Sequence, residues 1–210
     1  MSDRLSPLYA LLIFAALLVP IWSALSTQRS VGRIEAIKSG EMDPVEHAQR
    51  LSDRNQVQDP AEWRATARAL DASAPEKSAL TITLLERALV HAPNDYQAWA
   101  FLAFVKRQAT NEFSSEVDAD LKRSFETCPY CDKALLRWRF TLVLANWDDV
   151  SEENRLHAFS GADFLRWWHL DYDYLEEVRQ AAIARKIPFD EYRRKIDTPV
   201  RPNEIGLEEN

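Results

Sequence analysis

The chain has 210 residues, of which 46% are hydrophobic and 28% charged, a composition typical of a globular protein and not of a disordered one. Its 26 basic and 33 acidic residues give a net charge of −7, so no strongly basic surface is available for nucleic-acid phosphates. Its four glycines do not cluster, which excludes Gly-rich phosphate loops and the Gly-x-Ser-x-Gly elbow. We therefore expect neither a nucleic-acid partner nor a nucleotide-fold enzyme.

Residues 1–28 are predicted to form a short cytoplasmic tail and a transmembrane anchor. No residue from Leu5 to Gln28 is charged, and a hydrocarbon core of about 30 Å needs about 20 apolar helical residues. The competing interpretation is a cleaved signal peptide, with Arg4 as its positive region and a passable cleavage site at Ala24-Leu25-Ser26. The apolar run extends through Ile21-Trp22, beyond the usual signal-peptide core, which favours the anchor.

The orientation of this anchor decides the compartment of the rest of the chain. Arg29, Arg33 and Lys38 follow the apolar segment, and by loop charge alone this favours a cytoplasmic C-terminal part. A short tail nevertheless commonly stays inside while a long downstream domain is translocated. We expect a single-pass protein with a periplasmic C-terminal domain.

Two Asp-Pro pairs indicate helix starts after the anchor. Asp43-Pro44-Val45-Glu46 and Asp59-Pro60-Ala61-Glu62 each place an N-cap acceptor, a proline at the first helical position and a glutamate that can reach back to the cap. The polar segment from Leu51 to Gln58 is predicted to be a loop, so residues 29–58 should form a juxtamembrane helix and a linker. The chain has no sustained alternation of polar and apolar residues, so no strand is predicted and the chain is expected to be all-α.

The region from Leu80 to Leu144 repeats one helical plan. An apolar helical face is followed by the break Ala92-Pro93-Asn94-Asp95 and then by a new helix, which together predict a helix-turn-helix pair. The plan recurs with Thr127-Cys128-Pro129-Tyr130 as the break. The prolines of the two breaks are 36 residues apart, close to the period of about 34 residues in tetratricopeptide repeats.

Over residues 78–146 the chain resembles the tetratricopeptide repeat family. The small residues Ala88 and Ser124 precede the two prolines, and Trp99 stands early in a following helix. Ala103 and Lys106 depart from the family pattern, which commonly has Gly and Tyr at these places. The resemblance implies stacked helix pairs whose concave face can hold a peptide or helix of a partner.

Two repeats are few, because about three or more are usually needed for a stable stack. The flanking helices from Asp59 to Ser73 and from Ser151 to Lys186 are therefore expected to cap the array in one helical domain over residues 59–197, followed by a flexible tail at 198–210. Further features are predicted in the second flank: an N-cap at Ser151, a break at Ser160-Gly161, a core cluster of Phe164, Leu165, Trp167 and Trp168, an interruption at Ile187-Pro188 and a short helix from Asp190 to Ile196.

The tetrapeptide Cys128-Pro129-Tyr130-Cys131 has the letters of the glutaredoxin active site. A glutaredoxin needs a buried strand before this motif, whereas the preceding SEVDADLKRSFET is amphipathic and predicts a helix. The motif also takes the place of the earlier break at 92–95, so we interpret it as a turn between helices. A disulfide between Cys128 and Cys131 is compatible with export, and a thiolate at Cys131 would be stabilised by the adjacent helix start.

No catalytic residue, metal site or cofactor is predicted. The four histidines, His47, His91, His157 and His169, are scattered and are expected to be packed or solvated. Asp171-Tyr172-Asp173 resembles the Asp-x-Asp pair of glycosyltransferases, but without strands it is better explained as a helix N-cap before Tyr174. The candidates for interaction with a partner are Tyr96, Trp99, Lys106, Tyr130, Arg137 and Trp168.

The chain is also similar to small, single-span bacterial repeat proteins encoded with exopolysaccharide, capsule or holdfast biosynthesis, of the VpsP-like type. The residues that carry this likeness are LLERALVHAPNDYQAWAFLA and the spacing from Leu121 through Ser124, Pro129 and Leu135 to Arg139. The likeness implies a non-catalytic scaffold at the bacterial inner membrane. Its partners would be other membrane or periplasmic proteins of polysaccharide synthesis or export.

Two alternatives stay open. One is a thiol-disulfide oxidoreductase that uses Cys128 and Cys131. The other is a tetratricopeptide subunit of cytochrome c maturation, although the chain has no haem-binding motif.

Overall fold

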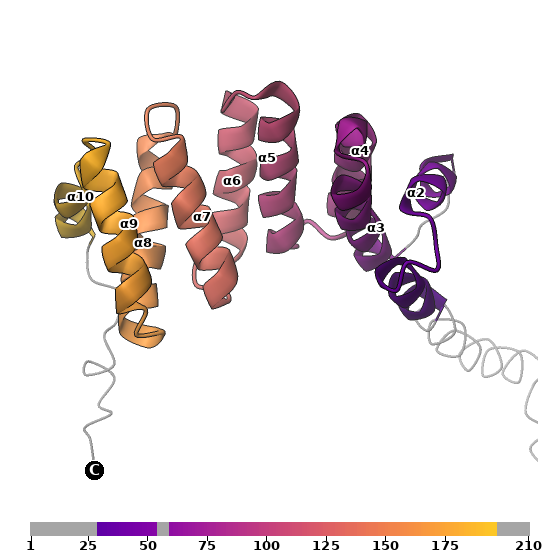
Figure 1. Cartoon of the computed structure of the whole chain (residues 1–210), viewed down its shortest axis with the longest axis horizontal. Helices are drawn as coiled ribbons and strands as arrows, with labels where there is room; N and C mark the ends of the chain where they lie inside the picture. Colours follow the sequence, from indigo (N-terminus) through magenta and orange to yellow (C-terminus); the bar gives the residue numbers. More distant parts are fainter. Residues whose placement is uncertain (1–28, 54–58, 197–210) are drawn as a thin grey trace, which may run out of the picture. The chain divides into compact units, whose positions relative to one another are not determined.

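A computed structural model describes residues 29–53 and 59–196, and all regular structure in them is helical, as expected (Figure 1). The predicted anchor at 1–28, the linker residues 54–58 and the tail from residue 197 lie outside the described residues. Among the helices that are described, none has the length and apolar character needed to cross a bilayer. The chain divides into two compact units, Met1–His91 and Ala92–Asn210, where the sequence predicts one helical domain over residues 59–197.

The first unit contains a helix at residues 29–38, α2 (Pro44–Asp53), α3 (Pro60–Ser73), the 3-10 turn η1 (Pro75–Lys77) and α4 (Ser78–His91). The helices α3 and α4 pack along each other, and α2 packs against both. The predicted helix starts are confirmed, because Asp43 accepts a hydrogen bond from the Val45 amide at 2.8 Å and Asp59 accepts one from the Ala61 amide at 3.0 Å. The core of this unit includes Leu51, Trp63, Leu70, Leu84 and Leu85.

Two expectations for this unit are wrong. The loop expected from Leu51 starts later, since α2 continues to Asp53 and thereby buries Leu51 in the core. Glu62 does not reach back to its helix cap. It is fully buried and binds Arg33, with 2.6 Å between Oε1 and Nε, and His47, with 3.0 Å between Oε1 and Nε2. A buried carboxylate needs such partners, and here they come from two other helices.

The second unit contains α5 (Tyr96–Thr110), α6 (Ser115–Thr127), α7 (Lys133–Ala145), α8 (Glu152–Trp168), α9 (Tyr172–Ala184) and α10 (Phe189–Lys195). The helix α5 packs along α6, α7 packs along α8, and α9 and α10 pack against α8. The core of this unit is apolar and rich in aromatic rings, with Phe125, Phe140, Trp147, Phe159 and Phe189 among its members.

Side-chain caps set the helix starts of this unit. Asp95, Ser114, Asp132 and Ser151 each accept a hydrogen bond from a backbone amide in the first turn of the helix that follows. The predicted breaks at 92–95, at the CPYC turn and at 187–188 are confirmed, as is a short helix near 190–196.

The helices pair as α3 with α4, α5 with α6 and α7 with α8. The proline-containing breaks therefore lie between pairs. The expectation that the break at 92–95 joins the two helices of one pair is wrong, because α4 ends the first unit and α5 begins the second.

The break expected at Ser160-Gly161 is also wrong, since α8 runs without interruption from Glu152 to Trp168. A Cβ atom added at Gly161 would lie 3.1 Å from Cδ2 of Leu136 on α7. The glycine therefore serves close packing of α7 against α8, and the surrounding contacts outweigh its weak helix propensity.

Candidate functional site around the CPYC turn

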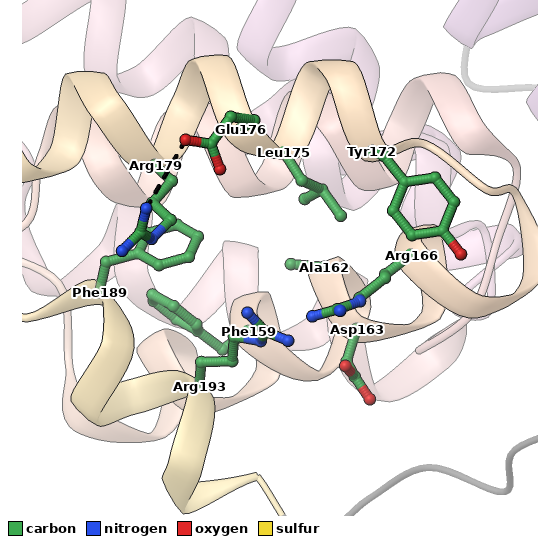
Figure 2. Close-up of a pocket in the computed structure, with 10 residues that line it drawn as sticks. All are labelled: Phe159, Ala162, Asp163, Arg166, Tyr172, Leu175, Glu176, Arg179, Phe189 and Arg193. Carbon is green, nitrogen blue, oxygen red and sulfur yellow. Dashed lines mark ion pairs between the residues drawn. The ribbon is translucent and has the colours of Figure 1, made fainter.

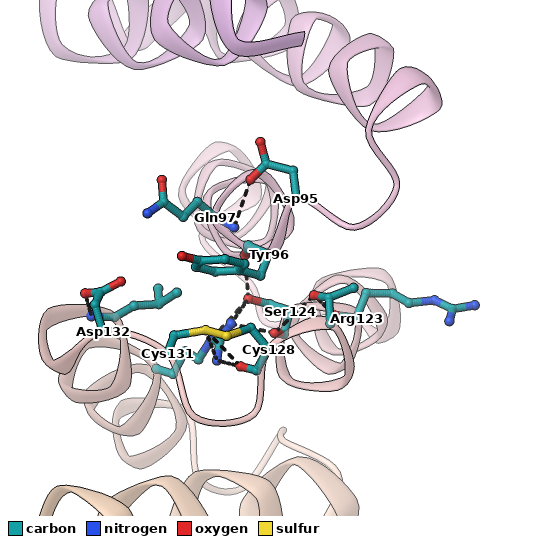
Figure 3. Close-up of a disulfide and its surroundings, with 11 residues drawn as sticks. Asp95, Tyr96, Gln97, Arg123, Ser124, Cys128, Cys131 and Asp132 are labelled. Carbon is teal, nitrogen blue, oxygen red and sulfur yellow. Dashed lines mark hydrogen bonds between the residues drawn. A yellow bond between two sulfur atoms is a disulfide. The ribbon is translucent and has the colours of Figure 1, made fainter. Parts of the chain in front are cut away.

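The CPYC turn joins α6 to α7. Cys128 is the C-cap residue of α6, and Asp132 caps α7 by accepting a hydrogen bond from the Leu135 amide at 3.0 Å. Cys128 and Cys131 form a disulfide, with their Cα atoms 5.6 Å apart (Figure 3). Cys131 is buried, with 9% of its surface exposed, whereas Tyr130 between the two cysteines is 43% exposed.

Arg139 of α7 is fully buried and donates hydrogen bonds to this turn. The Arg139 guanidinium donates to the Ser124 hydroxyl from Nε at 3.1 Å and to the Cys128 carbonyl from Nη1 at 2.7 Å. Its Nη2 also donates to the Ser124 carbonyl. The Ser124 hydroxyl in turn donates to the Tyr96 carbonyl at 2.7 Å. Arg139 thus supplies a donor to the Cys128 carbonyl at the C-terminus of α6, and it adds a donor to the Ser124 carbonyl, which also accepts from the Cys128 amide at 3.4 Å.

Backbone carbonyl dipoles and the nearby Asp132 carboxylate stabilise the charge of Arg139. Burial lowers the pKa of Arg139 to about 10, so the group remains a cation at neutral pH. The C-terminal end of α6 carries partial negative charge and stabilises that cation. The Cys131 sulfur lies 3.9 Å from Nη1 of Arg139, and a neighbouring cation favours the thiolate over the thiol once a disulfide is reduced. The burial of Arg139 could not be predicted from its neighbours in the sequence, Trp138 and Phe140.

Two of the predicted interaction residues flank one aromatic ring. The Tyr130 ring stacks on Phe164 of α8 with 4.8 Å between centroids, and Phe164 stacks on Trp168 with 5.7 Å. The Tyr130 hydroxyl lies 3.0 Å from the Ser160 hydroxyl. We call Tyr130, Phe164 and Trp168 the aromatic row. Its two ends are 43% and 41% exposed, so they present ring surface to solvent.

The expected core cluster at the end of α8 is therefore only partly right. Leu165 is fully buried and Phe164 and Trp167 are half-buried, but Trp168 is exposed. Leu170 and Tyr172, which follow closely in the chain, are also large exposed residues. The short segment 168–172 therefore exposes three large side chains to solvent.

Asp171 does not cap α9 with its side chain, which corrects the expected N-cap role. Its carboxylate instead accepts from Arg137 of α7, with 2.5 Å between Nε and Oδ2, and pairs with Lys133 at 2.9 Å. The hydrogen bond from Arg137, helped by Lys133, holds the pKa of Asp171 below its usual range. The Arg137 guanidinium also lies over the Tyr174 ring, 4.7 Å from its centroid. The predicted residue Arg137 thus ties the start of α9 to α7.

The other predicted interaction residues, Tyr96, Trp99 and Lys106, lie on α5. The Tyr96 carbonyl accepts from Ser124, the Trp99 indole donates to the Pro93 carbonyl at 2.8 Å, and Lys106 pairs with Asp120 at 2.9 Å. All three side chains are half-buried. Tyr130 and Trp168 both stack on Phe164, whereas Tyr96, Trp99 and Lys106 of α5 are not part of the aromatic row.

The histidines are packed against neighbouring groups. His91, His157 and His169 contact the rings of Trp63, Phe125 and Phe164 respectively, and His47 binds Glu62. In residues 29–53 and 59–196, no cluster of three or more His, Cys, Asp or Glu side chains is arranged to hold a metal ion.

The described residues define an all-helical protein built from pairs of adjacent helices, with an exposed aromatic row beside a cysteine-containing turn. No family model, curated protein or solved structure matches the chain.

Proposed function

We propose that the protein is a non-catalytic, membrane-anchored scaffold of the tetratricopeptide-repeat type, accessory to polysaccharide synthesis or export at the bacterial inner membrane. The observation that carries this proposal is the aromatic row of Tyr130, Phe164 and Trp168, which exposes two large rings at its ends. The partner binds there through an apolar or aromatic segment of its own.

The physical argument rests on how such rings bind proteins. Aromatic side chains offer a large contact area with few rotatable bonds, so ordering them on binding costs little entropy. In the aromatic row this cost is lower still, because stacking on Phe164 already orders Tyr130 and Trp168. Arg137 and Lys133 of α7 pair with Asp171, three residues after Trp168, and they supply polar groups of the kind found at interface rims.

The helix pairs support the repeat-type part of the proposal. The pairs α3/α4, α5/α6 and α7/α8 consist of helices of 13 to 17 residues joined by short connections. Repeats of this kind bury a core between neighbours and leave side chains free for partners. An anchor in residues 1–28 would confine the search for a membrane partner to two dimensions and so raise its effective concentration.

The test is site-specific photo-crosslinking in cells, with p-benzoylphenylalanine placed at position 130 or 168 of the full chain. The matched control position is Ile183 of α9, which is 46% exposed and lies outside the aromatic row. We expect the same discrete crosslinked protein from positions 130 and 168, none from 183, and its identification by mass spectrometry as a component of a polysaccharide synthesis or export complex. An equal yield from position 183, or no product from 130 and 168, contradicts the proposal, and a c-type apocytochrome would favour a cytochrome maturation role instead.

A second candidate function is thiol-disulfide exchange, favoured by the cationic Arg139 beside Cys131. It predicts that the Cys128–Cys131 disulfide oxidises a dithiol peptide and is itself reduced to two thiols, with glutathione disulfide as the oxidant that restores it for turnover. Cys128→Ser should abolish this turnover while leaving the helical content unchanged. Turnover that survives Cys128→Ser, or no turnover in the unaltered chain, eliminates this function.

A further inference from the structure

The disulfide between Cys128 and Cys131 closes the turn that carries Tyr130, one end of the aromatic row (Figure 3). Cys128 ends α6 on one side of the turn, and Asp132 caps α7 on the other. The cross-link restricts the backbone of the two residues between the cysteines, because it removes conformations that an open chain would sample. The disulfide and the stacking on Phe164 therefore both determine where the Tyr130 ring lies.

The two cysteines differ in their surroundings. Cys128 is half-buried, whereas only 9% of the surface of Cys131 is exposed, so a thiol in solution reaches Cys128 more easily. The Cys131 sulfur lies 3.9 Å from Nη1 of the buried Arg139. A cation at this place stabilises the thiolate that leaves when the disulfide is attacked at Cys128.

We propose that the disulfide between Cys128 and Cys131 is a redox switch of the aromatic row, which a small thiol opens by attack on Cys128. The closed, oxidised form holds Tyr130 in the row and binds the partner, and the open, reduced form binds the partner more weakly. This inference rests on the proposed function, in which the partner binds the aromatic row, and it does not require catalytic turnover of the disulfide.

The disulfide opens by thiol-disulfide exchange in two steps. A thiolate of the reductant attacks Sγ of Cys128, a sulfur–sulfur bond forms between them, and the bond to Cys131 breaks with its electron pair on the Cys131 sulfur. A second thiolate then attacks the sulfur of the reductant in this mixed disulfide, and Cys128 leaves as a thiolate that takes a proton from water. The chain gains two electrons, and the reductant is oxidised to its own disulfide.

Opening changes two contacts of the turn. The cross-link no longer restricts the backbone at Tyr130, so stacking on Phe164 has to order that backbone as well as the ring, at a cost in entropy. The Cys131 thiolate also attracts Arg139, whose Nη1 donates to the Cys128 carbonyl at 2.7 Å in the closed form. Both changes loosen the end of the row that Tyr130 provides.

The first test measures whether the disulfide determines the position of Tyr130. The full chain is labelled with 3-fluorotyrosine, and its fluorine NMR spectrum is recorded before and after reduction with dithiothreitol, which mass spectrometry verifies. Tyr130→Phe identifies the signal of Tyr130, and Tyr172→Phe identifies that of Tyr172, an exposed residue of α9 outside the turn. Reduction should shift the signal of Tyr130 and leave that of Tyr172 in place.

The matched control is the double variant Cys128→Ser/Cys131→Ser, which has no disulfide to reduce. Dithiothreitol should leave its spectrum unchanged. An unchanged Tyr130 signal on reduction of the unaltered chain, or the same shift in the double variant, would overturn the proposal.

The second test locates the attack. The full chain is treated with glutathione, quenched with acid and mapped by peptide mass spectrometry, and the mixed disulfide should be found on Cys128. Glutathione on Cys131, or an intact disulfide in millimolar glutathione, would contradict the proposed opening.

The third test measures binding of the partner. p-Benzoylphenylalanine is placed at position 168, which belongs to the row but leaves Tyr130 unchanged, in the unaltered chain and in Cys128→Ser/Cys131→Ser. The yield of the crosslinked protein should be about threefold or more lower in the double variant, and circular dichroism should show equal helical content.

The outcomes separate the switch from the proposed function. Equal yields from the two chains would overturn the switch and leave the proposed function intact. No product from the unaltered chain would contradict the proposed function, and the fluorine signal of Tyr130 would then decide by itself whether the disulfide controls the row.

Discussion

Among the residues that the structure describes, Arg139 and Glu62 are charged side chains with no exposed surface, and each is stabilised in a different way. Glu62 binds the cationic Arg33 and the ring of His47, whereas Arg139 binds carbonyl and hydroxyl oxygens at the end of α6. An unpaired buried charge is strongly unfavourable, so both side chains constrain which helices can pack around them.

Replacing Arg139 with methionine should destabilise the second unit. The substitution keeps a long side chain but leaves the Cys128 carbonyl without its Arg139 donor and removes one of the donors to the Ser124 carbonyl, at a cost of about 1–3 kcal/mol in the free energy of unfolding. Urea denaturation of the full chain measures this change. Arg123→Met on the exposed side of α6 is the control, and its effect should stay within about 0.5 kcal/mol. Equal losses in both variants would show that Arg139 does not secure the turn.

Glu62 should make the stability of the first unit depend on acid pH. Burial by itself raises the pKa of Glu62, but hydrogen bonds from His47 and Arg33 outweigh it and hold the pKa below its ordinary value of 4.5. A lowered carboxyl pKa contributes stability that is complete above the pKa of the unfolded chain and is lost as the pH falls below it.

Glu62→Gln should therefore cost about 1–3 kcal/mol at neutral pH. The difference from the unaltered chain should shrink as the pH falls below about 4. Urea titrations at a series of pH values measure the difference, and a gap that stays constant across the series would mean that the charge of Glu62 is not what stabilises this cluster.

At the scale of elements, close approach within a helix pair depends on one small residue. Gly161 lies where a Cβ would be 3.1 Å from Leu136, so α7 and α8 can pack tightly there. A glycine in a helix costs about 1 kcal/mol relative to alanine, and the close contact with Leu136 offsets this cost.

Gly161→Val should weaken the α7/α8 pair by about 1–3 kcal/mol through overpacking. Gly161→Ala should change stability by less than about 1 kcal/mol, because its better helix propensity offsets a small shift of the Leu136 side chain. Thermal unfolding of the two variants gives the comparison. The double variant Gly161→Val/Leu136→Ala should lose less stability than the sum of the two single losses, and additive losses would place the strain elsewhere.

At the scale of the whole molecule, the two compact units each have their own buried core. The helix pairs fall inside these units, with α3/α4 in the first and α5/α6 and α7/α8 in the second. A fragment should therefore fold only if it keeps its pairs intact.

We expect a fragment of residues 92–196 to unfold cooperatively, because it retains two complete helix pairs together with α9 and α10. A fragment from Ser78 to Asn146 should show no cooperative transition, since it separates α4 from α3 and α7 from α8. Differential scanning calorimetry of both fragments measures this. Cooperative melting of the shorter fragment would mean that the pairs are not the folding units.

The sequence by itself determined the helices and most of their ends. Asp43-Pro44, Asp59-Pro60, Ser151 and the breaks at 92–95 and 128–131 all act on backbone groups within a few residues, so local chemistry is sufficient to predict them. The one predicted break that failed, at Ser160-Gly161, depends on a contact with Leu136, 25 residues earlier in the chain.

Only the tertiary structure decided the sites. Arg139 is buried and donates a hydrogen bond to the CPYC turn, and Tyr130 stacks in one row with Phe164 and Trp168. Both arrangements depend on the packing of helices, which brings together residues that are far apart in the chain. The pocket lined by Phe159, Leu175 and Phe189 likewise needs three helices to meet (Figure 2). Helical periodicity shows which residues share a face, but only packing decides what that face meets.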